Sequence, residues 1–417
     1  MDLLERIDPA AGERVPRKLV WVLGLGSFGL AWAVTTVAAY LPPVLERYTH
    51  SRTVVGGILG AEGAFALALP LVVGPLSDRL RTPLGRRRPY MLVALPLLAL
   101  GLAGTAFAPS LWTTVVAVGI FFLAYYVYET PYRSLYADLL ERRVLGRSQG
   151  VQHLLRGAAL GLALVLGGVL FALWHGLPFL LSAAVVAVSG GLLVVWIREP
   201  AQPGERRELR ESLAAPFRIV RRQTDVRRFL VANTLWEFTF AGMRTFVVLY
   251  VTKGLGQPVI VSSAVLGAVA AGYLVAAVFA GRLGDRIGLA RTILAAAAVY
   301  GVGLCGGVLP HTWRWLYLGV VFFVSIAAGA VMTLASALLF KLMPARDHAA
   351  IAGLSTVSRG IGLVLGPVLV GLAIDRAQPF FERTHGYQAM WPAVGIPVLA
   401  SLPLVVLLCR AEARAGA

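Results

Sequence analysis

The chain has 417 residues, of which 58% are hydrophobic and 14% are charged. Soluble globular proteins carry roughly a quarter charged residues, so this composition excludes a soluble enzyme and a disordered protein. The mean hydropathy is +0.75, and many long apolar runs without strict alternation exclude an outer-membrane barrel. The composition therefore indicates a helical integral membrane protein.

The net charge of +17 is carried mostly by the segments between the apolar runs, so we expect no nucleic-acid partner. Two cysteines, Cys305 and Cys409, are too few for a disulfide framework, and the six histidines show no metal-ligand spacing. The sequence also lacks a phosphate-binding G-x-x-x-x-G-K-[ST] motif. We therefore expect no metal and no cofactor, and an ion gradient as the energy source.

Twelve apolar runs are long enough to cross a hydrocarbon core of about 30 Å. In chain order they are residues 19–41, 53–76, 90–108, 112–138, 149–173, 177–197, 229–251, 259–281, 292–309, 315–340, 349–374 and 388–409. We expect an all-α membrane protein made of an N-terminal six-helix half (1–197), a cytoplasmic linker (198–228) and a C-terminal six-helix half (229–417).

Lysines and arginines predict the orientation of these spans. If the N-terminus is cytoplasmic, the inner segments carry 28 of them and the outer loops carry 6. Positive residues favour the cytoplasmic side of a membrane. The bias therefore predicts a multi-pass protein of the cytoplasmic membrane with both termini inside the cell.

The two halves repeat each other. Gly74-Pro-Leu-Ser-Asp78-Arg79 follows the second span, and Gly281-Arg-Leu-Gly-Asp285-Arg286 follows the eighth span 207 positions later. Arg156-Gly157 and Arg359-Gly360 form a second match at an offset of 203. Such repeats are a standard transporter architecture, with a substrate site between pseudo-twofold-related halves.

These loops carry a family resemblance. The signature G-x-x-x-D-R-x-G-R-R is typical of the major facilitator superfamily, and here its first copy is lengthened to end in Gly85-Arg86-Arg87-Arg88-Pro89-Tyr90. That form, together with Pro131-Tyr132-Arg133-Ser134-Leu135-Tyr136-Ala137-Asp138 at the end of span 4, resembles the glycoside-pentoside-hexuronide and sucrose-proton symporters. The resemblance implies transport by alternating access around a central cavity.

The charged loop suggests a conformational latch. The Asp78 carboxylate lies beside a turn rich in arginine and can form ion pairs at the inner helix ends only while those ends are close together. The alternative is that the arginines only mark topology. The candidate latch residues are Gly74, Asp78, Arg79, Gly85, Arg86, Arg87, Arg88, Asp138, Gly281, Asp285 and Arg286.

Ionisable residues inside spans are costly and are functional candidates by default. Seven qualify, and all fall on spans that line the cavity in the superfamily: Glu62, Glu129, Arg133, Arg156, Glu237, Arg244 and Arg359. Four arginines against three glutamates leave one positive charge in excess, so an anionic substrate remains open. Arg156 and Arg359 could instead clamp the inner gate.

Span 4 offers a binding site for a polyol. Glu129 and Arg133 are four residues apart and can pair on one helical face, which they share with Tyr125, Tyr132 and Tyr136. Charged groups and aromatic rings together suit the hydroxyls and C–H faces of a sugar. The alternative is an internal ion pair that only stabilises the span.

A proton is the expected coupling ion. In the melibiose-type relatives, paired aspartates on span 2 hold sodium, and those positions here are Ala66 and Pro70, so sodium is not supported. Glu62 has no basic residue within a helical turn and is the first candidate for the proton, followed by Glu237 and then Glu129.

The resulting expectation is a monomeric, proton-coupled secondary transporter that takes up a sugar or glycoside by symport. Two alternatives within transport are a proton-antiport exporter of amphipathic compounds and an organic-anion transporter. A scaffold that no longer transports is a third alternative, and the retained buried charges argue against it.

Overall fold

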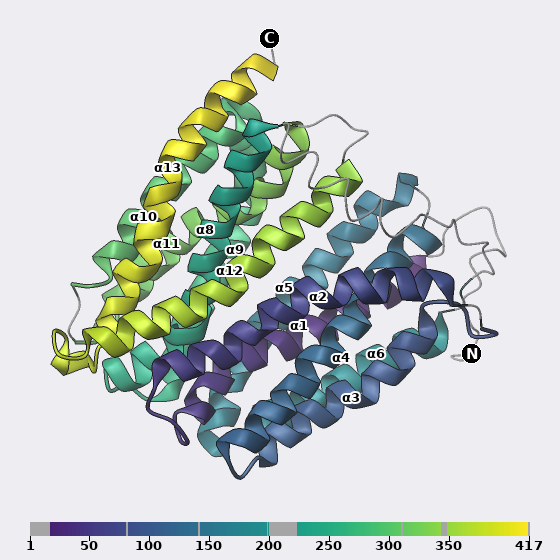
Figure 1. Cartoon of the computed structure of the whole chain (residues 1–417), viewed down its shortest axis with the longest axis horizontal. Coiled ribbons are helices and arrows are strands. Elements are labelled where there is room, and N and C mark those ends of the chain that lie inside the picture. Colours follow the sequence, from purple (N-terminus) through teal and green to yellow (C-terminus); the bar gives the residue numbers. More distant parts are fainter. Residues whose placement is uncertain are drawn as a thin grey trace. The chain divides into compact units, whose positions relative to one another are not determined.

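The computed structural model describes residues 17–80, 82–140, 142–197, 199, 223–309, 312–342 and 348–415. Most of the expected linker, residues 200–222, lies outside the described residues. Within the described part, long α-helices account for nearly all of the regular structure (Figure 1).

Twelve long helices in the described residues match the twelve expected spans and confirm the all-α prediction. The first six are α1 (Arg17–Leu45), α2 (Arg52–Arg79), α3 (Arg88–Phe107), α4 (Leu111–Leu139), α5 (Arg142–Leu173) and α6 (Leu177–Trp196). The others are α8 (Thr224–Leu249), α9 (Val259–Ile287), α10 (Leu289–Gly306), α11 (Leu316–Lys341), α12 (His348–Ala377) and α13 (Met390–Ala415). Short turns η1 (Tyr250–Gly254), η3 (Glu382–Thr384) and η4 (Tyr387–Ala389) lie between them.

Eleven of these helices are long and apolar enough to cross a membrane. The remaining one is α8, whose apolar sequence is interrupted by Asn233, Glu237 and Arg244. In lipid every backbone N–H and C=O must be satisfied within the segment, which is why apolar runs of this length are helical. The polar residues of α8 are therefore tolerated only where protein surrounds them.

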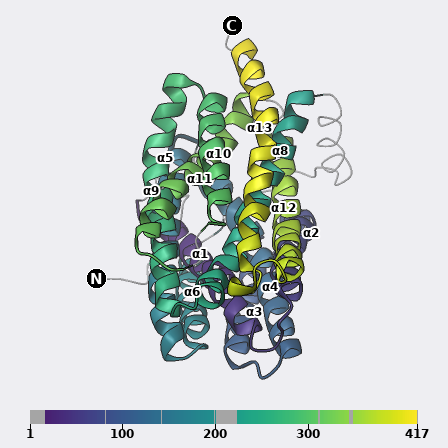
Figure 2. The same cartoon turned by 90° about the vertical axis from the view of Figure 1, so that its left-hand side faces the viewer.

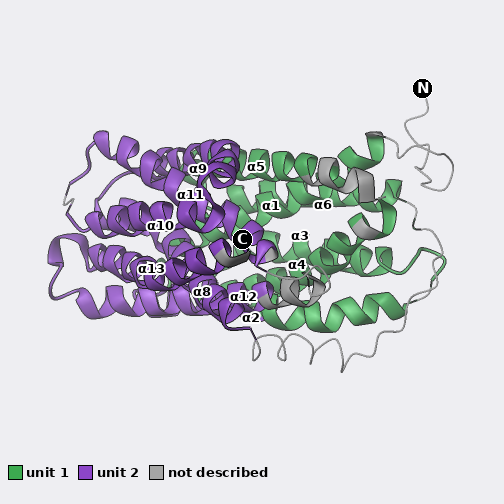
Figure 3. Cartoon of the chain, turned by 90° about the horizontal axis from the view of Figure 1, so that it is seen from above, with its two compact units in different colours: residues 1–48, 65–206 green, residues 49–64, 207–417 purple. Residues whose placement is uncertain are grey.

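The chain divides into two compact units (Figure 3). Unit 1 comprises residues 1–48 and 65–206, and unit 2 comprises residues 49–64 and 207–417. The same four kinds of helix pair pack in each unit. In unit 1 the pairs are α1–α5, α1–α6, α3–α4 and α3–α6. In unit 2 they are α8–α12, α8–α13, α10–α11 and α10–α13, and Figure 2 shows α13 beside α8 and α10. The sequence repeat is thus matched by a repeat of packing.

The first part of α2 packs closely on α12 inside unit 2. A Cβ atom added to Gly56 or Gly63 would lie 2.1 Å from the Pro367 oxygen or 2.6 Å from the Gly360 oxygen, so only glycine allows this approach. At the start of α2, the Asp375 side chain accepts hydrogen bonds from the backbone N–H groups of Arg52 (3.0 Å) and Thr53 (2.8 Å). This carboxylate satisfies donors that the first turn of a helix leaves without partners.

Candidate functional site

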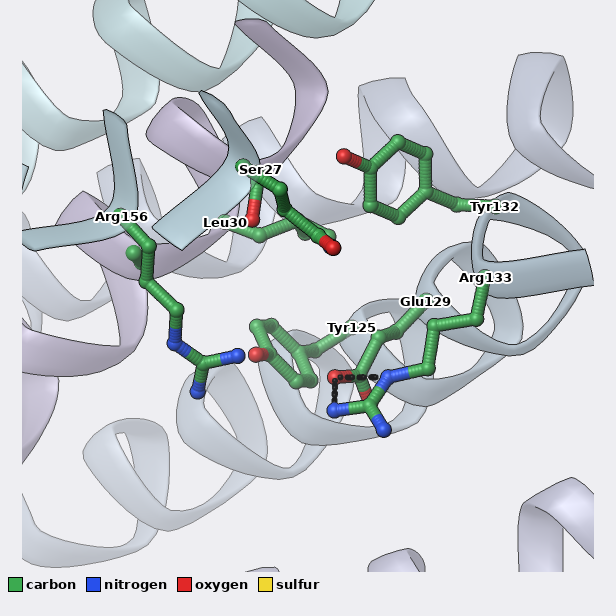
Figure 4. A pocket seen from close by; sticks show the side chains of 9 residues that line it. Ser27, Leu30, Tyr125, Glu129, Tyr132, Arg133 and Arg156 are labelled. Atoms are coloured by element: carbon green, nitrogen blue, oxygen red, sulfur yellow. Dashed lines mark hydrogen bonds and ion pairs between the residues drawn. The ribbon is translucent and has the colours of Figure 1, made fainter. Parts of the chain in front are cut away.

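A small polar cavity in unit 1 lies between α1, α4 and α5 (Figure 4). Its volume is about 10 Å³, which is room for about one water molecule, so only a single polar group of a larger cargo fits it as it stands. The lining residues are Ser27, Leu30, Ala31, Tyr125, Glu129, Tyr132, Arg133, Gln152 and Arg156. Two arginines against one acid give this cavity a net positive lining.

Glu129 and Arg133 form the pair that their spacing predicts. The Glu129 carboxylate accepts from Arg133 Nε at 3.0 Å and lies 2.8 Å from Arg133 Nη2. The side chain of Glu129 is 13% exposed and that of Arg133 is 53% exposed. This forked contact uses the acid of the cavity to neutralise one of its two arginines.

Arg156 is the second arginine of the cavity and is half-buried on α5. It makes no hydrogen bond or ion pair with any residue that the structure describes. Figure 4 shows its guanidinium pointing across the cavity toward Tyr125 and the Glu129–Arg133 pair. The uncompensated charge of the cavity is therefore the positive charge of Arg156.

The predicted tyrosines separate into two roles. Tyr125 and Tyr132 line the cavity, whereas Tyr136 is buried and bonds the Tyr132 hydroxyl at 3.0 Å. The Tyr132 hydroxyl also donates to the Leu23 carbonyl of α1 at 2.6 Å. Tyr136 thus positions Tyr132 against α1 and does not line the cavity.

Unit 2 holds a separate cluster of charged residues within its helices. Glu62 is 3% exposed and pairs directly with Arg244 of α8. The interpretation of Glu62 as the least neutralised acid is therefore wrong, because its partner comes from a helix 182 positions away in sequence. Glu237 has Arg359 of α12 as its ion-pair partner, with Arg359 Nε 3.9 Å from its carboxylate.

The loop between α2 and α3 carries a network of ion pairs inside unit 1. Arg87 is 5% exposed and contacts both Asp78 (2.5 Å) and Asp138 (3.1 Å). Arg86 contacts Asp138 at 2.7 Å. Arg87 also donates to the Ser77 hydroxyl, which in turn donates to the Gly74 carbonyl at 2.8 Å. The ion pairs expected around Asp78 are present, and their action as a latch stays a prediction.

Glu199 completes this network and was missed from sequence. Its carboxylate accepts from the backbone N–H of Arg87 at 2.9 and 3.0 Å, just ahead of α3. Burial raises the pKa of Glu199, while the N–H groups of Arg87 and Arg86 oppose that rise. The one sequence signal for this contact is an acid immediately after span 6, next to a basic loop.

The equivalent loop of unit 2 is built differently. Glu412 of α13 accepts from the backbone N–H groups of Leu289 (3.1 Å) and Ala290 (2.8 Å), at the start of α10. Lys341 of α11 pairs with Glu412 at 2.8 Å. Asp285 is exposed and makes no ion pair within the described residues, and neither does Arg286. The second copy of the motif therefore lacks the ion pairs of the first.

The remaining loop candidates occupy supporting positions. Arg88 is buried and donates from Nε to the Val194 carbonyl of α6 at 3.0 Å. Arg79 is exposed at the end of α2. Gly85 has a φ of +97°, and a Cβ there would lie 1.9 Å from Glu199, so glycine is required at this turn. Gly74 and Gly281 have no such close neighbour.

Comparison with known proteins decides the family. The family model described as Major Facilitator Superfamily matches residues 23–271 and again residues 238–416. The chain belongs to the major facilitator superfamily. It is therefore a membrane transporter of small molecules and not an enzyme.

One curated relative of this superfamily member matches over nearly its whole length. The chain is 26% identical over 378 residues to a protein described as "Multi-drug resistance efflux pump PmrA homolog" of Lactococcus lactis subsp. lactis (strain IL1403), which covers 86% of this chain and 88% of the relative. The finer resemblance to the sugar symporters is not supported by this relative.

Solved structures show the same fold. A bacterial homolog of the human lysosomal transporter Spinster, crystallised inward-facing and unoccupied, aligns with a TM-score of 0.76 at 14% identity over 95% of this chain and 98% of that one. The nucleoside transporter NupG aligns with a TM-score of 0.76 at 13% identity over 94% and 98%. At these identities the likeness concerns the fold alone.

Proposed function

We propose that this superfamily member is a proton-coupled exporter of small organic molecules that carry an anionic group. The observation that carries the proposal is Arg156, a cavity arginine without a partner among the described residues, beside an acid that Arg133 already neutralises. A charge within a membrane-spanning helix is costly unless it is paired, so an anionic group of the cargo relieves that cost. Export follows the curated relative, which is described as an efflux pump.

A proton gradient is the proposed energy source. Three carboxylates within the membrane-spanning helices can bind a proton there: Glu62 and Glu237 in unit 2, and Glu129 in unit 1. A single chain as the transport unit stays a prediction from the sequence. The positive-inside bias supports cytoplasmic termini.

Inward symport of a neutral sugar is the second candidate. It is favoured by the two tyrosines that line the cavity together with Glu129, because aromatic faces and charged acceptors suit a polyol. The two candidate substrates differ in the interaction that they make with Arg156. A neutral sugar uses it as a hydrogen-bond donor, whereas an anion depends on its charge.

A ligand-stabilisation experiment separates the candidates. Purified protein is heated with glucose, glucuronate, benzamide or benzoate, because a ligand that binds the folded state raises the melting temperature. We expect stabilisation by glucuronate and benzoate but not by their neutral counterparts, and loss of that stabilisation in Arg156→Gln. Arg227→Gln, which changes an exposed arginine on α8, is the matched control. Stabilisation by glucose that equals that by glucuronate would favour the sugar symporter.

A further inference from the structure

The two acids within the helices of unit 2 differ in how their charge is balanced. Glu62 is in direct contact with Arg244, and its side chain is 4% exposed. A carboxylate held against a guanidinium is stabilised as the anion, and breaking such a pair is strongly unfavourable. Glu62 therefore has its counter-charge in place.

Glu237 is placed differently. Its side chain is 15% exposed, and its nearest cation, Arg359 Nε, lies at 3.9 Å, which is beyond hydrogen-bond distance. Glu237 forms no hydrogen bond with any residue that the structure describes. Close packing restricts it, because a Cβ added to Gly362 of α12 would lie 2.7 Å from Glu237 Cβ. A buried carboxylate without donors carries a free-energy cost that a bound proton removes.

The groups around Glu237 come from four other helices. The charged ones are Arg359 from α12, Arg244 from α8 itself and Glu62 from α2. Tyr273 from α9 and Tyr300 from α10 also interact with it electrostatically. Because Glu62 already offsets the charge of Arg244, Arg359 is the one cation in this set left to balance an ionised Glu237.

We propose that Glu237 is the residue that binds and releases the transported proton, and that Glu62 is a fixed counter-ion of Arg244. This inference rests on the proposed proton coupling and names the group responsible. The proton passes from water to a carboxylate oxygen of Glu237 and returns to water, and no other bond is made or broken. In the ionised form Arg359 balances the carboxylate, and in the protonated form Arg359 is released from it.

The test observes the proton directly and uses no cargo. Infrared difference spectra are recorded between acidic and alkaline pH on purified protein in lipid, where a protonated carboxyl group gives a C=O stretching band. The other carboxyl groups of the chain also contribute to this band, so we expect one component of it to be absent in Glu237→Gln and retained in Glu62→Gln. Because Glu62→Gln strands Arg244, the double variant Glu62→Gln with Arg244→Gln is measured as well. Glu382→Gln, which changes an exposed acid of η3, is the control.

The outcomes are distinct. Retention of the full band in Glu237→Gln, or its loss in the Glu62/Arg244 double variant, would overturn the assignment. A band that depends on Glu237 while benzoate and glucuronate fail to stabilise the protein would leave the proton site standing and refute the anionic cargo. In proteoliposomes loaded with a pH indicator, a gradient of glucuronate, which does not cross the bilayer readily by itself, should drive proton movement in the wild type and in the double variant but not in Glu237→Gln. Glucuronate-driven proton movement that persists in Glu237→Gln, and that is absent from protein-free liposomes, would contradict the inference.

Discussion

The loop before α3 and the loop before α10 descend from one repeated motif, yet only part of the motif has the same structure in both. Gly85 and Gly288 both have positive φ, +97° and +99°. In unit 1, Glu199 lies just after α6 and accepts a hydrogen bond from the backbone N–H at the start of α3. In unit 2, Glu412 lies near the end of α13 and accepts from the backbone N–H groups at the start of α10. Around this shared core, unit 1 adds three arginine–aspartate contacts and unit 2 adds one lysine.

The difference separates what holds the fold from what is specific to one copy. The turn and its glutamate occur in both units, so they serve the packing of helices that each unit shares. The contacts of Arg86 and Arg87 with Asp78 and Asp138 occur only in unit 1. At the position of Asp138, 203 residues later, unit 2 carries Lys341, which has the opposite charge. A conformational role is therefore expected from the loop of unit 1 alone.

The largest difference should appear between Asp138→Asn and Lys341→Gln. Asp138 accepts from two arginines, one of them buried, so we expect its loss to lower the free energy of unfolding by about 1.5–3 kcal/mol. Lys341 has a side chain that is 48% exposed, and we expect its loss to cost at most about 1 kcal/mol. Thermal unfolding of the two purified variants checks this, and equal losses would contradict the asymmetry.

Asp78→Asn and Asp285→Asn should differ in transport. If the Asp78–Arg87 pair stabilises one conformation, its loss should shift the conformational equilibrium by roughly tenfold and slow net transport while expression stays near normal. Asp285 has no ion pair among the described residues, so its variant should behave as the wild type. Accessibility labelling from each side of the membrane measures the shift, and identical labelling in both variants would refute the latch.

Gly85→Ala should be more harmful than Gly288→Ala. Both substitutions place a Cβ at positive φ, which costs about 1–2 kcal/mol. At Gly85 the added atom would also lie 1.9 Å from Glu199, whereas at Gly288 it would lie 3.4 Å from Glu412. We expect the first variant to unfold at a lower temperature, and the reverse order would show that Glu199 does not sit against this turn.

The smallest expected effect is a pH dependence that comes from Glu199. Burial raises the pKa of Glu199 in the folded protein above its unfolded value, so folding favours the protonated form. Its contribution to stability is therefore greatest below the ordinary glutamate range and falls as the pH rises through the raised pKa. Glu199→Gln should remove this slope from a plot of melting temperature against pH. The difference between wild type and variant measures it, and a slope of the opposite sign would contradict the assignment.

Local features of this protein could be predicted from sequence, and contacts between distant segments could not. The apolar runs predict the twelve helices because lipid leaves the backbone no alternative. The Glu129–Arg133 pair follows from a spacing of four residues on one helix. Other contacts depend on which helices pack together, and the spacing of charges along the chain does not predict this. They are the pairing of Glu62 with Arg244 and the backbone contacts of Glu199 and Glu412.

The contact between Asp375 and the start of α2 also constrains how the chain is made. The Arg52 N–H and the Asp375 carboxylate that receives it are separated by 323 residues. At a synthesis rate of about 5–20 residues per second, roughly 15–65 s pass between the synthesis of the first turn of α2 and the synthesis of this acceptor. The glycines of α2 that pack on α12 are likewise made long before α12 is. Until its partner helix has been made, α2 exposes a surface that biosynthetic factors of the membrane can bind. Substitutions at Gly56 or Asp375 should therefore lower the amount of assembled protein before they affect any other property.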